Sequence, residues 1–102
     1  MGLTIENEQS SDGSLIRVAG EVDLYSSPEL RKAILKSIPK AQGSLAIDLN
    51  GVTYIDSSGV ATLVEGLRSA REHDISFVLV DPSPAVKQVL ELARLDSVFE
   101  VR

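Results

Sequence analysis

Apolar residues recur along this chain in two alternating patterns, one typical of strands and one typical of amphipathic helices. Short apolar runs bounded by turn residues predict strands over 3–7, 15–20, 44–49, 75–80 and 98–101. Apolar residues spaced three and four apart predict helices that begin near Ser26, Ser57 and Pro84 and end near Ile38, His73 and Ala93. The elements follow one another as strand, strand, helix, strand, helix, strand, helix, strand.

This order predicts an α/β fold, with a small mixed, largely parallel β-sheet packed with helices. Strands that alternate with helices need crossover connections, which make neighbouring strands parallel. The turn at 11–14 makes the first two strands an expected antiparallel hairpin. The run 75–80 is almost continuously apolar, as expected for a strand covered on both faces. With 102 residues and neither repeats nor a linker, the chain is expected to be one domain over 1–102.

Local signals predict where several elements begin and end. Ser26 is expected to cap the first helix with its hydroxyl, and Ser83 to cap the third, with Pro84 at its first position. Asn50-Gly51 is a turn pair and is expected to close the strand before it. The expected core residues come from all of these strands and helices: Leu15, Ile47, Leu49, Leu63, Leu67, Val78, Val80 and Leu90.

The segment 52–64 contains the most informative change of pattern. An apolar run ends at Ile55, and Asp56, Ser57 and Ser58 follow just before the apolar spacing becomes helical. Side-chain oxygens there can accept hydrogen bonds from the unpaired N–H groups of the first helical turn. The segment is therefore either a helix cap or a site on which a partner acts. Gly59 favours a special role, because a helical glycine is about 1 kcal/mol less favourable than alanine unless close approach is needed.

A second segment with an acid and a hydroxyl, Asp23 to Ser26, follows the second strand. The carboxyl ends of neighbouring parallel strands meet at one edge of a sheet, so Asp23 and Asp56 are expected to lie close together. This edge would present two acids and several hydroxyls, which suits recognition by a partner. Two carboxylates alone make a poor metal site, and no metal is expected there.

Composition narrows the classes of function. The absence of cysteine excludes disulfides, thiolate chemistry and cysteine metal sites. The net charge of −5, with no block of Lys or Arg, argues against nucleic acid or an anionic membrane surface and favours protein partners. No stretch approaches the about 18 apolar residues of a membrane span, and no signal peptide is recognisable. A cytoplasmic location is therefore expected.

No set of residues in the sequence predicts catalysis or a cofactor. The one histidine, His73, falls near a helix C-terminus, where a solvated residue favoured by the helix dipole is expected. The Gly-x-Ser-x-Gly elbow of hydrolases, the P-loop and the dinucleotide fingerprint are all missing. We therefore expect a protein that is not an enzyme, with no catalytic residue and no cofactor.

In order and spacing, these motifs resemble the STAS domain family, and within it the bacterial anti-sigma factor antagonists. The stretch 54–61 is similar to the family signature. Four further segments resemble the family's first loop, central strand, third helix and closing strand: 20–23, 47–49, 83–87 and 95–99. The resemblance covers nearly the whole chain and implies a small mixed sheet with helices.

The resemblance also implies a phosphorylation switch at Ser57. In the family, the serine just after the motif's aspartate is phosphorylated by an anti-sigma factor that is also a serine kinase, and a serine phosphatase reverses this. The unphosphorylated antagonist binds the anti-sigma factor and thereby frees the sigma factor. Ser58 is then expected to support the loop, and Asp23 matches a family aspartate near the phosphorylated serine.

The partner is expected to dock on the edge that holds Ser57 and on the exposed side of the following helix. The expected contacts are Asp23, Ser26, Ser27, Asp56, Ser57, Ser58, Gly59, Glu65, Arg68 and Ser69. An alternative remains open. Relatives include stressosome components and non-catalytic accessory subunits of lipid-transporting ABC systems, in which the same helix would dock on a larger protein and Ser57 would be only a cap.

Overall fold

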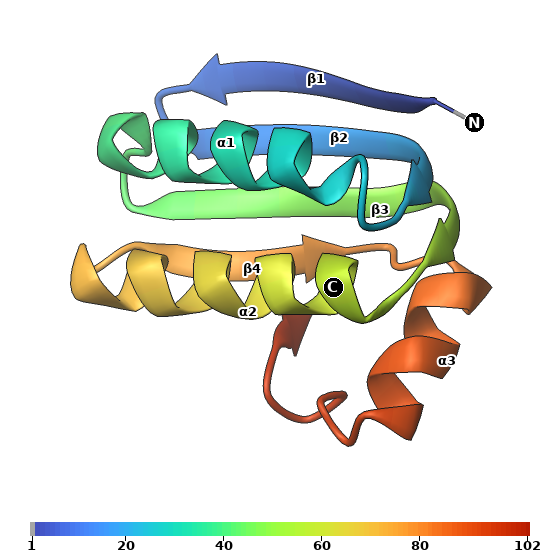
Figure 1. Ribbon diagram of the computed structural model, residues 1–102. Helices are drawn as coiled ribbons and strands as arrows, with labels where there is room; N and C mark the ends of the chain where they lie inside the picture. The colour runs from blue at the N-terminus through green and yellow to red at the C-terminus, as the bar shows by residue number, and fades with distance from the viewer. Residues whose placement is uncertain (1) are drawn as a thin grey trace.

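The computed structural model describes residues 2–102, which form a β-sheet with helices packed on one side (Figure 1). In chain order the elements are β1 (Leu3–Ser10), β2 (Gly13–Val22), α1 (Ser27–Ser37), the short 3-10 helix η1 (Ile38–Lys40), β3 (Ser44–Ile55), α2 (Ser57–Glu72), β4 (Ser76–Val80), α3 (Pro84–Leu92) and β5 (Glu100–Val101). This is the predicted order, with η1 as an addition at the end of the first helix.

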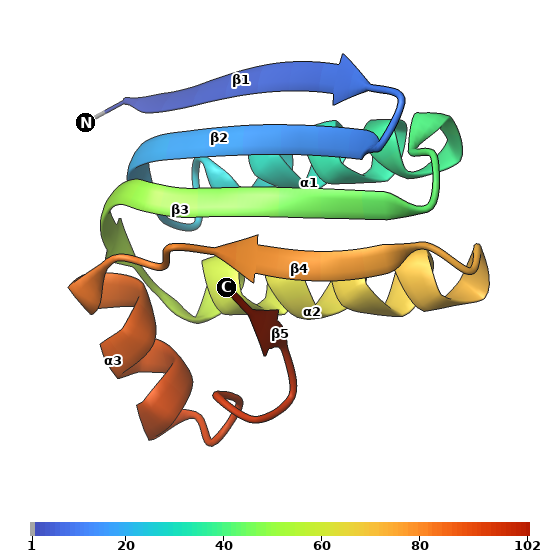
Figure 2. The ribbon, with the colours of Figure 1, turned by 180° about the vertical axis from the view of Figure 1, so that it is seen from behind.

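The described strands form one five-stranded sheet in the order β1-β2-β3-β4-β5. β1 pairs with β2 in antiparallel fashion, and the other three pairings are parallel. α1 and α2 lie side by side over one face, while the other face carries no helix (Figure 2). The predicted fold class, a small, largely parallel mixed sheet packed with helices, is confirmed.

The core lies between the sheet and the helices, and α3 contributes Val86 and Leu90 to it. Six of the eight predicted core residues are buried, and the other two, Leu15 and Val80, are only half-buried. The prediction that Leu15 is a core residue is wrong because side chains alternate between the two faces along β2. Ile16 and Val18 point into the core, so Leu15 points to the helix-free face. In β4, residues 77–79 are all buried, as predicted for a strand covered on both faces.

The predicted turn at Asn50-Gly51 is wrong, because β3 continues through both residues to Ile55. Gly51 instead faces Ala19 of β2, where the register of the parallel pair shifts. A Cβ atom on Gly51 would lie only 2.8 Å from the Ala19 Cβ, so the glycine permits close approach of two backbones at an irregular point of the sheet. The extra length of β3 carries its carboxyl end to the end of β2.

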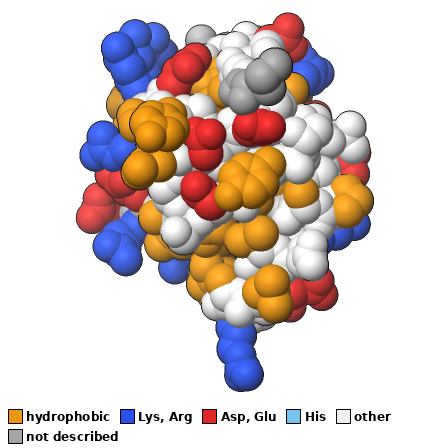
Figure 3. All heavy atoms as spheres, turned by 45° about the vertical axis from the view of Figure 1, so that its right-hand side comes forward, with side chains coloured by type: hydrophobic (Ala, Val, Ile, Leu, Met, Phe, Trp, Pro, Cys, Tyr) orange, Lys and Arg blue, Asp and Glu red, His pale blue; other side chains and the backbone are white. Residues whose placement is uncertain are grey.

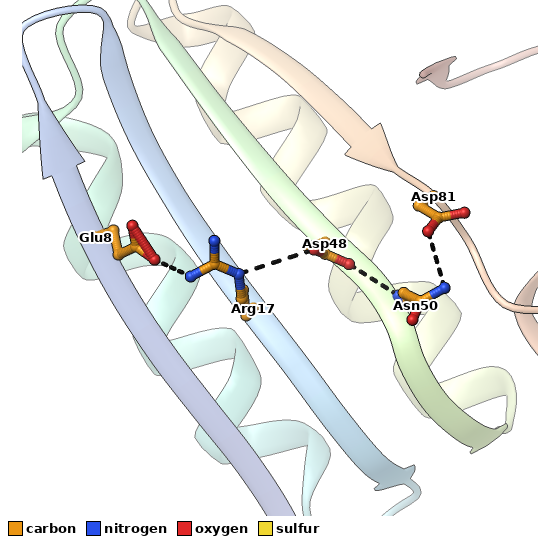
Figure 4. A network of polar contacts seen from close by, with 5 residues as sticks. All are labelled: Glu8, Arg17, Asp48, Asn50 and Asp81. Carbon is orange, nitrogen blue, oxygen red and sulfur yellow. Dashed lines mark hydrogen bonds and ion pairs between the residues drawn. The ribbon is translucent and has the colours of Figure 1, made fainter.

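The helix-free face of the sheet is polar. Arg17 forms ion pairs with Glu8 of β1 and Asp48 of β3, and the Asn50 side-chain amide donates to Asp81 at 2.8 Å (Figure 4). Exposed ion pairs of this kind add little to stability. They do keep the part of this face around Arg17, Asp48 and Asn50 hydrated, while Val78 of β4 on the same face is buried.

Candidate functional site

The candidate site lies where β2 and β3 end side by side. Val22 and Ile55, the last residues of these strands, are partners in the parallel register, and the Asp56 N–H donates to the Val22 carbonyl at 3.1 Å. The loop that begins at Asp23 therefore adjoins the turn into α2, as predicted from the parallel topology. Figure 3 looks onto this end of the molecule and shows acidic and apolar side chains intermingled there.

Asp56 caps the N-terminus of α2. One carboxylate oxygen, Oδ1, accepts from the backbone N–H groups of Ser58 at 3.0 Å and Gly59 at 3.3 Å. The Ser58 hydroxyl donates to the same oxygen at 2.5 Å. Asp56 thus supplies hydrogen-bond acceptors to N–H groups of the first helical turn, and its bond from the Ser58 hydroxyl helps to hold the turn.

Ser57, in contrast, is the first residue of α2 and is exposed. Within the described residues its hydroxyl takes part in no hydrogen bond, whereas the Ser58 hydroxyl donates to Asp56. The two adjacent serines therefore differ chemically: Ser58 holds the turn, and Ser57 offers a free hydroxyl to solvent.

Gly59 has a packing role beneath the turn. A Cβ atom there would lie 2.6 Å from Ile55 Cγ1 and 2.7 Å from Val22 Cγ1. The glycine lets α2 start directly on the ends of the two strands, which accounts for the loss of helix propensity at this position. Because Gly59 is buried, it shapes the turn and gives a partner no side-chain surface.

The loop from Asp23 to Ser26 is held by its own hydrogen bonds. Asp23 Oδ1 accepts from the N–H groups of Tyr25 at 2.9 Å and Ser26 at 3.0 Å. The Ser26 hydroxyl donates to the Glu21 carbonyl at 2.8 Å and accepts from the Asp23 N–H at 2.9 Å. The Ser26 backbone N–H is the largest influence that holds the pKa of the Asp23 carboxyl below its ordinary value.

These contacts correct the role predicted for Ser26. Its hydroxyl does not cap α1, because it turns back to the end of β2 and closes the loop. The next residue, Ser27, is 6% exposed and donates its N–H to the Asp23 carbonyl at 2.8 Å. Asp23, Ser26 and Ser27 therefore act first as a rigid support for the loop. The predicted cap at Ser83 is confirmed by its hydrogen bond from Val86 N at 3.3 Å.

The exposed side of α2 continues the site away from Ser57. A shallow groove of about 580 Å³ runs along the helix and is lined by α2 residues that include Ser57, Val64 and Arg68, together with Leu95. Arg68 is exposed and Ser69 is half-buried. The groove therefore joins the free hydroxyl of Ser57 to a positive charge farther along the helix.

Glu65 is engaged with the neighbouring helix. Both of its carboxylate oxygens accept from Arg31 Nε, at 2.8 and 2.9 Å, and Arg31 Nη2 lies 2.8 Å from Oε2. These hydrogen bonds lower the pKa of Glu65 and raise the pKa of Arg31. The bidentate pair ties α1 to α2 at the surface, so Glu65 has a structural contact as well as a place in the groove.

The apolar side chains at this end were missed at the sequence level. Tyr25 is 90% exposed, Leu24 66% and Tyr54 50%. Tyr54 is the strand partner of Glu21, so it lies beside the foot of the Asp23 loop. The sequence did contain a signal for an exposed apolar surface here. Leu24 and Tyr25 directly follow the acidic Asp23 and belong to no predicted strand or helix, so no element would bury them.

Other candidate chemistry is sparse in the described part of the chain. His73 lies at the C-terminus of α2, where its Nδ1 is 2.8 Å from the Ser69 carbonyl oxygen. Across residues 2–102, no group of three His, Asp or Glu side chains is arranged to hold a metal ion. None of the helices in this range is long and apolar enough to cross a membrane.

Comparison with known proteins agrees with this fold. Residues 4–102 match the model of the STAS domain family. The anti-sigma-B factor antagonist of Listeria monocytogenes is 32% identical over 103 residues, which cover 100% of this chain and 90% of that protein. The chain therefore belongs to the STAS domain family.

Solved structures share the fold. The anti-sigma factor antagonist of Mycobacterium paratuberculosis superposes with a TM-score of 0.87 at 27% identity, covering 98% of this chain and 85% of that one. Bacillus SpoIIAA in its phosphorylated form gives a TM-score of 0.74 at 22% identity, covering 97% and 91%. At that identity, the likeness to SpoIIAA concerns the fold alone.

Proposed function

We propose that this protein is an anti-sigma factor antagonist whose binding is switched off by phosphorylation of Ser57. The observation that carries the proposal is the difference between the two serines of the α2 turn. The Ser57 hydroxyl is exposed and unengaged within residues 2–102, whereas the Ser58 hydroxyl is held by Asp56. The name of the Listeria relative, an anti-sigma-B factor antagonist, supports the class of partner.

In its unphosphorylated form, the protein binds an anti-sigma factor and thereby releases the sigma factor that this partner holds. The contact surface we propose comprises the loop at Asp23 and Ser26, the Asp56–Ser58 turn, and Glu65, Arg68 and Ser69 of α2. Loop and turn adjoin at the ends of β2 and β3, and the groove on α2 extends them. The switch operates in the cytoplasm, where sigma factors act.

The anti-sigma factor is also the kinase in this proposal. The Ser57 oxygen attacks the γ-phosphorus of ATP, the bond to the bridging oxygen breaks, ADP leaves, and the hydroxyl proton passes to a base of the kinase. A serine phosphatase restores the hydroxyl by transferring the phosphoryl group to water. The fold tolerates such a group, because SpoIIAA is known in a phosphorylated form.

Phosphate at Ser57 would act through charge. It adds about −1.5 to −2 charges. The N–H groups of Ser58 and Gly59 already donate to Asp56 and are therefore not free to bind the phosphate. A like charge on the partner at ~5 Å then costs on the order of 3 kcal/mol with an effective dielectric near 20. That corresponds to about a hundredfold in affinity.

The test is incubation with the anti-sigma factor encoded in the same genome and ATP, followed by mass spectrometry. We expect phosphate on Ser57, on Ser57 again in Ser58→Ala, and none on Ser57→Ala. Ser57→Ala should bind the partner constitutively and Ser57→Asp poorly. Phosphate on Ser58, or on no serine, would overturn the assignment. Co-purification with a transporter permease, unaffected by Ser57→Asp, would instead favour the accessory-subunit alternative.

A further inference from the structure

Two large apolar side chains stand out on the loop between β2 and α1. Tyr25 is 90% exposed and its neighbour Leu24 is 66% exposed. Single exposed apolar residues are common on protein surfaces and need no explanation. An adjacent pair on a loop beside the proposed switch residue is a different case, because it places apolar surface where a partner is expected to lie.

Hydrogen bonds hold the backbone of the loop that carries these two residues. The Tyr25 N–H donates to Asp23 Oδ1 at 2.9 Å, and the Ser26 hydroxyl bridges the Glu21 carbonyl and the Asp23 N–H. Buried Ser27 anchors the end of the loop at the start of α1. A partner that covers Leu24 and Tyr25 therefore loses little entropy in ordering this backbone. Tyrosine also brings a large contact area with few rotatable bonds.

The surroundings of the pair define the chemistry of what covers it. Glu21 and Asp23 precede it directly on the chain. Figure 3 shows apolar side chains separated by acidic ones at this end of the molecule. A second copy of the same chain would bring acids against acids. A partner surface with an apolar pocket edged by Lys or Arg would satisfy both the apolar surface and the charge.

We propose that Leu24 and Tyr25 are the apolar anchor of the anti-sigma factor interface and insert into a pocket of the partner edged by basic residues. This inference rests on the proposed function and adds to it the residues that supply most of the affinity. Exposed Tyr that becomes buried at an interface is a frequent source of binding energy. Asp23 and Ser26 are then positioning residues for the anchor.

A consequence follows for the kinase reaction. The anchor touches the kinase but lies outside the reacting atoms, so its loss should weaken docking without changing phosphoryl transfer in the bound complex. Truncating Tyr25 is therefore expected to raise KM for the protein as kinase substrate and to leave kcat nearly unchanged. A merely structural role of Tyr25 would not produce this split.

The experiment is calorimetric titration of the unphosphorylated protein with the cognate anti-sigma factor. Tyr25→Ala should bind at least about tenfold more weakly, and Tyr25→Phe, which keeps the ring, within about threefold of wild type. The matched control is Leu92→Ala on α3, a 78% exposed leucine outside the site, which should bind like wild type. Thermal unfolding of each variant should remain within about 2 °C of wild type, because these side chains are exposed.

The outcomes separate the two proposals. Wild-type binding that survives both Tyr25→Ala and Leu24→Ala overturns the anchor and leaves the proposed function standing. Equal losses in Tyr25→Ala and Leu92→Ala also overturn it, since the effect would then not belong to the site. If the wild-type protein neither binds the anti-sigma factor nor accepts phosphate from it, the proposed function fails and the anchor fails with it.

Discussion

The Ser58 hydroxyl donates to Asp56 Oδ1 at 2.5 Å, and this contact separates the roles of two adjacent serines. The same carboxylate oxygen accepts the N–H groups of Ser58 and Gly59. Ser58 is thereby committed to the turn, while Ser57 is left exposed at the first position of α2. The helix cap thus leaves an exposed hydroxyl beside it, so a cap at Asp56 and the proposed phosphorylation of Ser57 are compatible.

The cap can be tested through stability. Asp56→Ala should destabilise the protein by about 0.5–2 kcal/mol, because it leaves first-turn N–H groups without an acceptor. Asp56→Asn is the matched control, since it retains an oxygen that can accept the same hydrogen bonds and should recover most of the loss. Chemical denaturation measures both variants. Equal stability of Asp56→Ala and wild type would show that water replaces the carboxylate at no penalty.

Gly59 should tolerate no side chain. Gly59→Ala would place Cβ 2.6 Å from Ile55 Cγ1 and 2.7 Å from Val22 Cγ1, both within the core. Overpacking of this kind typically costs about 1–3 kcal/mol, which exceeds the roughly 1 kcal/mol gained in helix propensity. In a Val22→Ala background one of the clashes disappears, so the penalty measured by denaturation should shrink. An unchanged penalty would locate the strain elsewhere.

Leu63 should be essential to the core. It is fully buried on the face of α2 that packs against the sheet. Leu63→Ala should therefore lower the free energy of unfolding by about 2–5 kcal/mol. Leu92→Ala, at an exposed position of α3, should change it by less than about 0.5 kcal/mol. A loss below that value at Leu63 would contradict the register of α2.

The pKa of Asp23 is lowered in the folded state, chiefly by the Ser26 N–H. Its folded pKa lies below the unfolded value of about 3.9, so the ionised carboxylate adds stability above that pH. This stability is lost as the pH falls through the folded pKa. The difference in stability between wild type and Asp23→Ala should therefore be largest near neutral pH and shrink in acid. Between Asp23→Asn and Asp23→Ala, which do not titrate here, the difference should stay constant with pH.

Periodic patterns were enough to predict the order of elements and the parallel sheet, because each element buries a regular stripe of side chains. The Asn50-Gly51 error shows the limit of local signals. These residues have turn propensity, yet pairing with β2 keeps them extended, and Gly51 is needed where Ala19 comes close. Leu15 was misplaced because the sequence does not reveal that one face of the sheet lacks helices.

The site was predictable in outline for a related reason. Parallel topology alone places the Asp23 loop beside the Asp56 turn, since β2 and β3 end together. The apolar pattern could not predict which partner an individual polar side chain contacts. The Ser26 hydroxyl donates to the Glu21 carbonyl, and Glu65 accepts hydrogen bonds from Arg31 of the neighbouring helix. Such contacts join residues on different elements, so they cannot be predicted from the spacing of residues along one element.

Arg68 gives a test of the helical part of the proposed interface. Its side chain is exposed at the far end of the α2 groove, whereas Glu65 nearby is paired with Arg31. Arg68→Glu should weaken binding to the anti-sigma factor on the order of tenfold at low salt, and less at high salt, because an attractive charge becomes repulsive. Its thermal unfolding should stay within a few degrees of wild type.

The control for this charge reversal is Lys87→Glu on α3. It changes the net charge by the same amount, and Lys87 is exposed and does not line the α2 groove. A loss of affinity confined to Arg68→Glu therefore reports a local contact rather than the protein's overall field. Equal losses in both variants would mean that only long-range charge is sensed. Undiminished affinity after both Asp23→Ala and Arg68→Glu would show that the partner docks on another face of the molecule.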